Sequence, residues 1–147
     1  MHNDLRERRL AAGMTQEDVA RYANVAAPNV AAYETGKRPM SRPMYERLVR
    51  ATRRPSAVLA EHADEVKARL AQAHAVNVRV FGSVARGQDT PDSDIDLLFD
   101  VEDGASAFEI GAAHEDLTNL LGCKVDLVSA RAVPMRKRWI FDEAVPL

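Results

Sequence analysis

The sequence of 147 residues has little of the material from which several kinds of site are built. It holds one cysteine, Cys123, so no disulfide can form within the chain. The four histidines, at positions 2, 62, 74 and 114, lack metal-ligand spacing, so a zinc site is not expected. The N-terminus has no apolar signal core, and no apolar run approaches membrane-spanning length. These absences predict a cytoplasmic protein with no membrane partner.

Charge is unevenly distributed along the chain, although the formal net charge is only -2. Up to Pro55 there are 11 Lys or Arg against 6 Asp or Glu, and the remainder has 9 against 16. No flexible tract rich in Gly or Ser separates the two parts. The contrast predicts two domains with different partners, residues 1–55 and residues 56–147. The basic domain suits a nucleic-acid backbone, whereas the acidic one would repel nucleic acid unless metal ions intervened.

The basic part has the pattern of an all-α bundle. Apolar residues recur at helical spacing over residues 5–12, and Gly13 is suited to end that helix. Thr15, with Asp18 three positions on, predicts the start of a second helix over residues 16–23. The further helices are expected over residues 28–36 and after Ser41.

The order Thr-Gln-Glu-Asp-Val-Ala, a short turn, then Tyr-Glu-Thr-Gly-Lys-Arg-Pro resembles the Cro/C1 (XRE) helix-turn-helix family over about residues 4–54. The resemblance implies that the third helix enters the major groove of DNA. It identifies Gln16 and Asn29 as amides able to read adenine. It also gives four candidates for phosphate contacts, Arg21, Lys37, Arg38 and Arg42.

This sequence departs from that family at alanines 26, 27, 31 and 32, where polar side chains commonly stand. Specific recognition would then depend on dimerisation across two half-sites, on thymine methyl contacts or on DNA shape. The alternative is a packing or dimer domain whose arginines form a solvated face.

The acidic part is organised around residues 78–101, which read as strand, tight turn, helix start, loop and second strand. Gly82 and Ser83 follow an apolar run where a strand should end. Their backbone N–H groups and the Ser83 hydroxyl can therefore face an anion such as a polyphosphate. Arg86 lies directly beyond this turn and is a further candidate for a phosphate contact.

Two carboxylates, Asp94 and Asp96, come about ten residues after this turn. Because side chains alternate along a strand, both lie on one face, and the apolar residues beside them lie on the other. Two adjacent carboxylates with no neighbouring lysine are costly to keep ionised unless cations bind them, and Mg²⁺ is the usual choice. A two-metal site normally needs a third carboxylate, for which Asp126 in a later strand-like run is the candidate.

This spacing of Gly-Ser, Asp-Xaa-Asp and a later strand Asp closely resembles the minimal nucleotidyltransferases of the DNA polymerase β-like superfamily, over roughly residues 57–147. The resemblance implies a site that uses two Mg²⁺ ions, with ATP as substrate. Its catalytic and metal-binding residues would be Asp94, Asp96 and Asp126. Its nucleotide-binding residues would be Gly82, Ser83 and Arg86.

The fold class expected from these patterns is a two-domain chain. An N-terminal all-α helix-turn-helix bundle precedes a C-terminal α/β (α+β) domain with a small mixed sheet. Besides the strands, that second domain is expected to contain helices over residues 56–74, 105–121 and 134–144.

Minimal nucleotidyltransferases of this type resemble the antitoxin half of bacterial HEPN/MNT toxin-antitoxin pairs, where the family activity is adenylylation of a tyrosine on a HEPN toxin. The resemblance implies an antitoxin that transfers AMP from ATP to its toxin and binds its own operator DNA, as a homo-oligomer or a hetero-oligomer with the toxin. Two alternatives stay open. One is a toxin-type nucleotidyltransferase acting on tRNA ends, and the other is a DNA-binding repressor with a catalytically inert nucleotidyltransferase domain.

Overall fold

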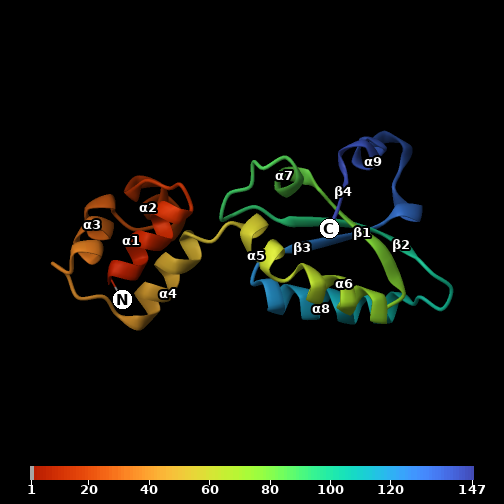
Figure 1. Cartoon of the computed structure of the whole chain (residues 1–147), viewed down its shortest axis with the longest axis horizontal. Coiled ribbons are helices and arrows are strands. Elements are labelled where there is room, and N and C mark those ends of the chain that lie inside the picture. The colour runs from red at the N-terminus through yellow and green to blue at the C-terminus, as the bar shows by residue number, and fades with distance from the viewer. Residues whose placement is uncertain (1) are drawn as a thin grey trace. The chain divides into compact units, whose positions relative to one another are not determined.

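The computed structural model describes residues 2–147, with side chains from Asp4 onward. The chain forms two compact units, Met1–Arg54 and Pro55–Leu147 (Figure 1). The first unit is all helical, and the second combines helices with one sheet. The predicted fold class is therefore confirmed. No helix in the described part of the chain is both long and apolar enough to cross a membrane.

The N-terminal unit consists of four helices, α1 (His2–Ala11), α2 (Gln16–Ala23), α3 (Ala27–Thr35) and α4 (Arg42–Ala51). The predicted helix starts are confirmed where a side chain supplies the cap. Thr15 accepts a hydrogen bond from the Asp18 N–H, and Asp18 accepts one from the Thr15 N–H. Ser41 accepts from the Met44 N–H at the start of α4. These caps satisfy backbone donors that the first turn of a helix leaves without partners.

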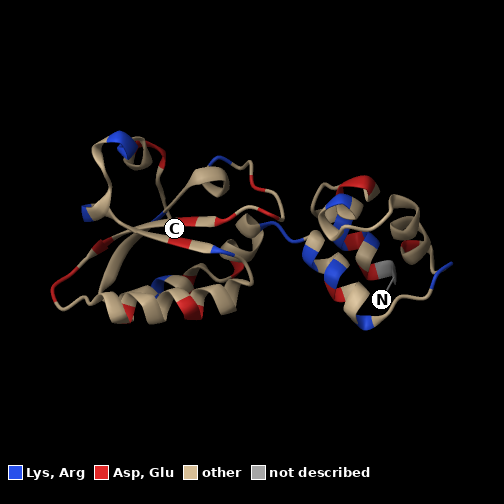
Figure 2. Cartoon of the chain, turned by 180° about the vertical axis from the view of Figure 1, so that it is seen from behind, with Lys and Arg blue, Asp and Glu red and all other residues tan. Residues whose placement is uncertain are grey.

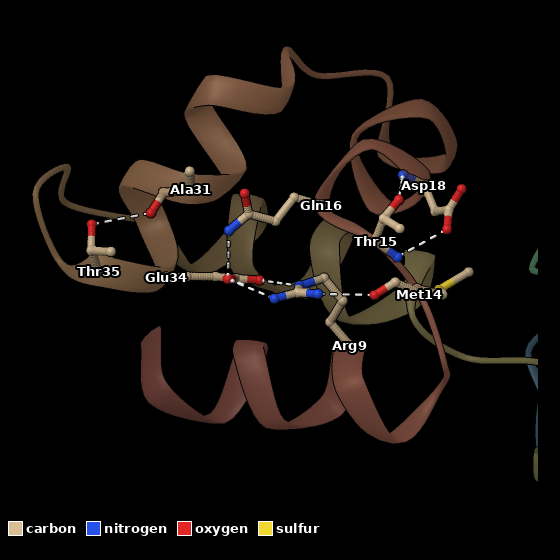
Figure 3. A network of polar contacts seen from close by, with 8 residues as sticks. All are labelled: Arg9, Met14, Thr15, Gln16, Asp18, Ala31, Glu34 and Thr35. Carbon is tan, nitrogen blue, oxygen red and sulfur yellow. Dashed lines mark hydrogen bonds and ion pairs between the residues drawn. The ribbon is translucent and has the colours of Figure 1, made fainter.

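A buried ion pair joins α1 to α3 within this unit. Arg9 Nε donates to Glu34 Oε1 at 2.6 Å, and Arg9 Nη2 donates to Glu34 Oε2 at 3.2 Å. The same guanidinium donates to the Met14 carbonyl, and Gln16 Nε2 donates to Glu34 Oε2 at 3.0 Å. Figure 3 shows Arg9 and Gln16 reaching Glu34 from two different helices. A buried carboxylate is tolerated because Arg9 and Gln16 both direct donors at it.

The C-terminal unit is built on a four-stranded sheet with the order β3-β2-β1-β4. Its strands are β1 (Ala75–Phe81), β2 (Ile95–Val101), β3 (Val125–Ser129) and β4 (Val145–Pro146). β1 is antiparallel to both β2 and β4, whereas β2 and β3 are parallel, so the sheet is mixed as predicted. The α8 helix (Ala107–Leu121) makes the crossover that a parallel pair requires.

Helices α6 (Ala63–Gln72) and α8 cover one face of this sheet (Figure 1). Ile95, Leu97 and Phe99 are buried in the core that those helices complete. The prediction that these three apolar residues face the core is therefore confirmed. On the other face a smaller cluster joins Leu98 to Phe81 and to Ile140 of α9 (Trp139–Glu143).

The predicted helix over residues 56–74 is wrong in its continuity. The structure has α5 (Pro55–Glu61) and then α6, with His62 between them in a non-helical conformation. The His62 N–H donates to the carbonyls of both Val58 and Leu59, which tightens the last turn of α5. Buried residues from both helices still join one core. The spacing of apolar residues is therefore helical on both sides of His62 and gives no sign of the break there.

The predicted helix over residues 134–144 is also wrong. Two single 3₁₀ turns, η1 (Ala130–Ala132) and η2 (Met135–Lys137), precede the five-residue α9. Ala144 then turns extended, and β4 pairs with β1 through Arg79 opposite Pro146 and Val80 opposite Val145. The extended Pro134 and the 3₁₀ turn that follows it therefore delay the helix until Trp139, and the extended Ala144 ends it before β4.

Candidate active site

Two of the three predicted carboxylates face each other on neighbouring strands. Asp96 of β2 lies directly opposite Asp126 of β3 in the parallel register, and Asp94 immediately precedes β2. Burial, a hydrogen bond with Asp126 and the charges of Asp126, Asp94 and Glu143, in that order of effect, together raise the pKa of Asp96 to about 6. Several acids therefore share one small region, where adding negative charge is costly.

A lysine lies between the carboxylates, contrary to the expectation that no lysine neighbours them. Lys124 Nζ lies 3.5 Å from Asp94 Oδ2 and 4.0 Å from Asp126 Oδ1. Lys124 is two residues before Asp126, so strand alternation places the two side chains on the same face. The side chain of Lys124 is largely exposed, so its ammonium can move away when another cation binds.

The donor set of this site suits Mg²⁺, which prefers carboxylate oxygens and commonly uses one or two of them together with substrate phosphates. In the described residues, no group of three or more His, Cys, Asp or Glu side chains is close enough to hold a metal ion by itself. The Asp96 and Asp126 pair therefore fits an ion whose remaining ligands come from a bound phosphate chain.

The turn at Gly82 lies against these acids. Gly82 is buried, begins the one-turn helix α7 (Gly82–Ala85) and has φ +74°, a conformation that favours glycine. A Cβ at this position would lie 2.1 Å from Asp96 Oδ2. Glycine is therefore required both for the backbone conformation and for the close approach of Asp96.

Glu143 of α9 occupies the predicted anion-binding groups. The Gly82 N–H donates to Glu143 Oε2 at 2.9 Å, and Arg86 Nη1 donates to Glu143 Oε1 at 2.5 Å. We call the Gly82 N–H and the Arg86 guanidinium the anion seat. Ser83 is half-buried in the same turn. The geometry thus brings Gly82 and Arg86 together on one carboxylate, which shows that this corner accepts an anion.

A groove of about 520 Å³ opens beside the acids. Asp96 and Asp126 contribute to its wall, and apolar and aromatic side chains make most of the rest: Phe81, Leu127, Val128, Val133, Trp139 and Ile140. The ring of Trp139 meets that of Phe81 edge to face, with 6.4 Å between centroids. Such a groove suits a flat organic group held next to two carboxylates.

The residues predicted to contact DNA lie in the N-terminal unit, and several are engaged within it. The Gln16 amide donates to Glu34, and the Asn29 side chain accepts from Arg38 Nη1 at 2.8 Å. Two predicted phosphate-contacting arginines form exposed ion pairs, Arg21 with Asp18 and Arg42 with Glu46. Lys37 is exposed next to Arg38 in the loop that follows α3. Figure 2 shows Lys and Arg spread over this unit, interspersed with acidic residues.

Two family models match the chain. A helix-turn-helix domain model covers residues 3–63, and a nucleotidyltransferase domain model covers residues 59–145. "Protein adenylyltransferase MntA" of Thermococcus cleftensis is 38% identical over 72 residues, which are 49% of this chain and 70% of that protein. "Putative protein adenylyltransferase MJ0126" of Methanocaldococcus jannaschii is 30% identical over 90 residues, which are 60% of this chain and 89% of that protein.

A solved structure titled "Structure of putative minimal nucleotidyltransferase" superimposes with a TM-score of 0.58 at 40% identity. The match covers 63% of this chain and 95% of that one. The nucleotidyltransferase model covers the part of the chain that holds strands β1 to β3, the paired carboxylates and the Gly82 turn. The chain therefore belongs to the nucleotidyltransferase family, as a minimal nucleotidyltransferase domain that follows a helix-turn-helix domain.

Proposed function

We propose that this chain transfers AMP from ATP to a tyrosine hydroxyl of a partner protein. The observation that carries the proposal is the pair of opposed carboxylates, Asp96 and Asp126, between an anion seat and an apolar groove. A nucleotidyl transfer needs a place for the phosphate chain, acids at the reacting phosphorus and room for the acceptor. The relatives named as protein adenylyltransferases support a protein acceptor.

In the proposed reaction, the triphosphate of ATP lies in the anion seat with Ser83 beside it. Asp126 accepts the proton of the acceptor hydroxyl, whose oxygen then attacks the α-phosphorus. The bond from the α-phosphorus to the bridging oxygen breaks, and pyrophosphate leaves with the electron pair. The acceptor ring enters the groove against Trp139, which places its hydroxyl at Asp126.

Asp94, Asp96 and Asp126 are the residues proposed to hold two Mg²⁺ ions, with substrate phosphates supplying the ligands that no three carboxylates of the described residues supply alone. Bound Mg²⁺ would neutralise charge on the phosphates and on the attacking and leaving oxygens. The displaced Lys124 ammonium would then be able to pair with a phosphate instead of with Asp94.

The partner proposed for this chain is a HEPN-type toxin, whose tyrosine would be modified and whose activity would thereby be silenced. The two units would serve as separate domains with a boundary near residue 55, and the N-terminal one would bind the operator of the same gene pair. Its match to a helix-turn-helix model supports that role. With Gln16 and Asn29 engaged inside the unit, phosphate contacts and DNA shape would carry much of the recognition.

The test is a label-transfer assay on the full chain with the protein encoded next to it and with Mg²⁺. ATP labelled at the α-phosphate should label the partner protein, and ATP labelled at the γ-phosphate should not. Labelling from the γ position would indicate a kinase. Labelling of added tRNA but not of the partner would support the tRNA-end alternative, and no labelling of either would contradict the proposal.

Replacing Gly82 with alanine should lower label transfer by about 10²-fold, because the new methyl group pushes Asp96 out of line with the phosphate. The free energy of unfolding of the C-terminal unit should change little by comparison, because the clashing oxygen is the end of the Asp96 side chain, which can rotate away. The matched control is Gly87→Ala, at a similar φ of +70° with no atom near the added Cβ. Equal losses of transfer in the two variants would show that backbone strain, and not the approach of Asp96, explains the effect.

A further inference from the structure

Glu143 takes no part in the proposed reaction, yet its carboxylate occupies the anion seat. Both of its oxygens are occupied, one by the Gly82 N–H and the other by Arg86. Its side chain is 18% exposed, whereas the neighbouring Asp142 is exposed. Burial raises the pKa of Glu143, but hydrogen bonds from Arg86 and Gly82 outweigh it and lower the pKa overall. The carboxylate is therefore charged at neutral pH.

A carboxylate and a phosphate compete for the same kind of donor. One backbone N–H and one guanidinium edge that hold Glu143 are unavailable to a phosphate oxygen until Glu143 leaves. Glu143 also lies close enough to Asp96 to raise its pKa. A triphosphate entering beside a retained Glu143 would add its negative charge to an acidic cluster.

The segment that carries Glu143 is lightly attached. α9 has five residues, only one of which, Ile140, is buried. Ala144, which follows Glu143, is extended and leads into the two-residue strand β4. The Glu143 side chain can therefore leave the anion seat without disturbing the main core, which α6 and α8 form on the opposite face of the sheet.

We infer that Glu143 is an internal occupant of the anion seat, which a triphosphate must displace before the enzyme can react. The inference rests on the proposed function, because it takes the seat to be the site of the phosphate chain. Because Glu143 must first leave the anion seat, the apparent affinity of the chain for any triphosphate, whatever its base, would be lower than it would be without Glu143. Displacement of Glu143 would also free the end of α9, the helix that places Trp139 in the groove, when nucleotide binds.

The experiment is isothermal titration calorimetry of the full chain with inorganic tripolyphosphate and Mg²⁺, a probe that has no base. Glu143→Gln keeps the side-chain shape and removes the charge, and Glu143→Ala removes the competing acceptor altogether. Each should bind tripolyphosphate about tenfold more tightly than the unaltered chain, which is the effect expected from one charge-assisted hydrogen bond. Asp142→Asn is the matched control, because it changes the net charge equally on an exposed neighbour, and it should leave the affinity unchanged.

Unchanged or weaker binding in both Glu143 variants would overturn the inference and leave the proposed function standing. Weaker binding in particular would mean that Glu143 holds Arg86 in position for the phosphate. Equal tightening in Asp142→Asn would attribute the effect to net charge and would also overturn it. Binding by none of the proteins would contradict the anion seat itself, and with it the proposed function.

Discussion

Replacing Arg9 with methionine is expected to destabilise the N-terminal unit by about 3–5 kcal/mol, because it leaves the Glu34 carboxylate buried without its cation. The side chains of Arg9 and Glu34 are only 10% and 3% exposed, so water cannot replace the lost partner. All three tyrosines lie in this unit and the single tryptophan lies in the other. Thermal unfolding followed by tyrosine fluorescence should therefore shift to lower temperature, and the tryptophan transition should not.

The matched control is Arg8→Met on the same helix. Arg8 pairs with Asp4 at 2.7 Å, but both side chains are more than 40% exposed, so this change should cost far less stability than Arg9→Met. The double variant Arg9→Met/Glu34→Leu should recover most of the lost stability, because it removes the buried charge as well as its partner. Similar losses in Arg8→Met and Arg9→Met would contradict the explanation by burial.

The stability of the N-terminal unit in the Arg9→Met variant should change with pH in the opposite direction from its stability in the unaltered chain. Burial raises the pKa of Glu34, but hydrogen bonds from Arg9 and Gln16 outweigh it and lower the pKa overall. Ionised Glu34 therefore stabilises the native unit above the unfolded pKa, and this contribution is lost as the pH falls through the folded pKa. Without Arg9, burial dominates and the pKa is raised, so the variant should gain stability as the pH falls towards the ordinary pKa of a glutamate.

Local signals in the sequence predicted the parts of the fold that depend on local chemistry. Thr15 and Ser41 start helices because the cap is formed within three residues. The alternation around Asp96 predicted which face of β2 is buried, since the period of a strand is set by its backbone alone. Residues that repeat with a fixed period can therefore be assigned to a face from their spacing alone.

Contacts between distant segments could not be predicted in the same way. Glu143 meets Gly82 from 61 positions away, and no local pattern marks a glutamate that ends a five-residue helix as a ligand of a turn. The engagement of Gln16 by Glu34 likewise depends on how α2 and α3 pack. Lys124 is different, because its spacing of two from Asp126 in a strand does signal a shared face. Its place beside the acids could have been predicted from the sequence.

Replacing Asp96 with asparagine is expected to reduce label transfer by on the order of 10³-fold, because the variant loses a carboxylate that the proposed reaction requires at the α-phosphorus. In metal-free buffer the same change should stabilise the C-terminal unit. Burial and the nearby acids raise the pKa of Asp96 to about 6, so ionising it at neutral pH opposes folding. With a discount for its partial exposure, asparagine should add about 1 kcal/mol of stability at pH 7.

The sign of this effect follows from linkage. The pKa of Asp96 is higher in the folded chain than in the unfolded one. Asp96 therefore lowers the stability of the C-terminal unit progressively as the pH rises from about 4 to about 6, and has no such effect at lower pH. The variant and the unaltered chain should therefore unfold at the same temperature at pH 4, and the variant should unfold at a higher temperature at pH 7, as followed by Trp139 fluorescence.

Asp100→Asn on the same strand is the control. A hydrogen bond from Asn77 and the charge of Arg79 lower the pKa of Asp100, so replacing its carboxylate should destabilise the C-terminal unit. A fall in stability at pH 7 in both variants would contradict repulsion among the acids, and would indicate that Asp96 is held by favourable contacts even without metal.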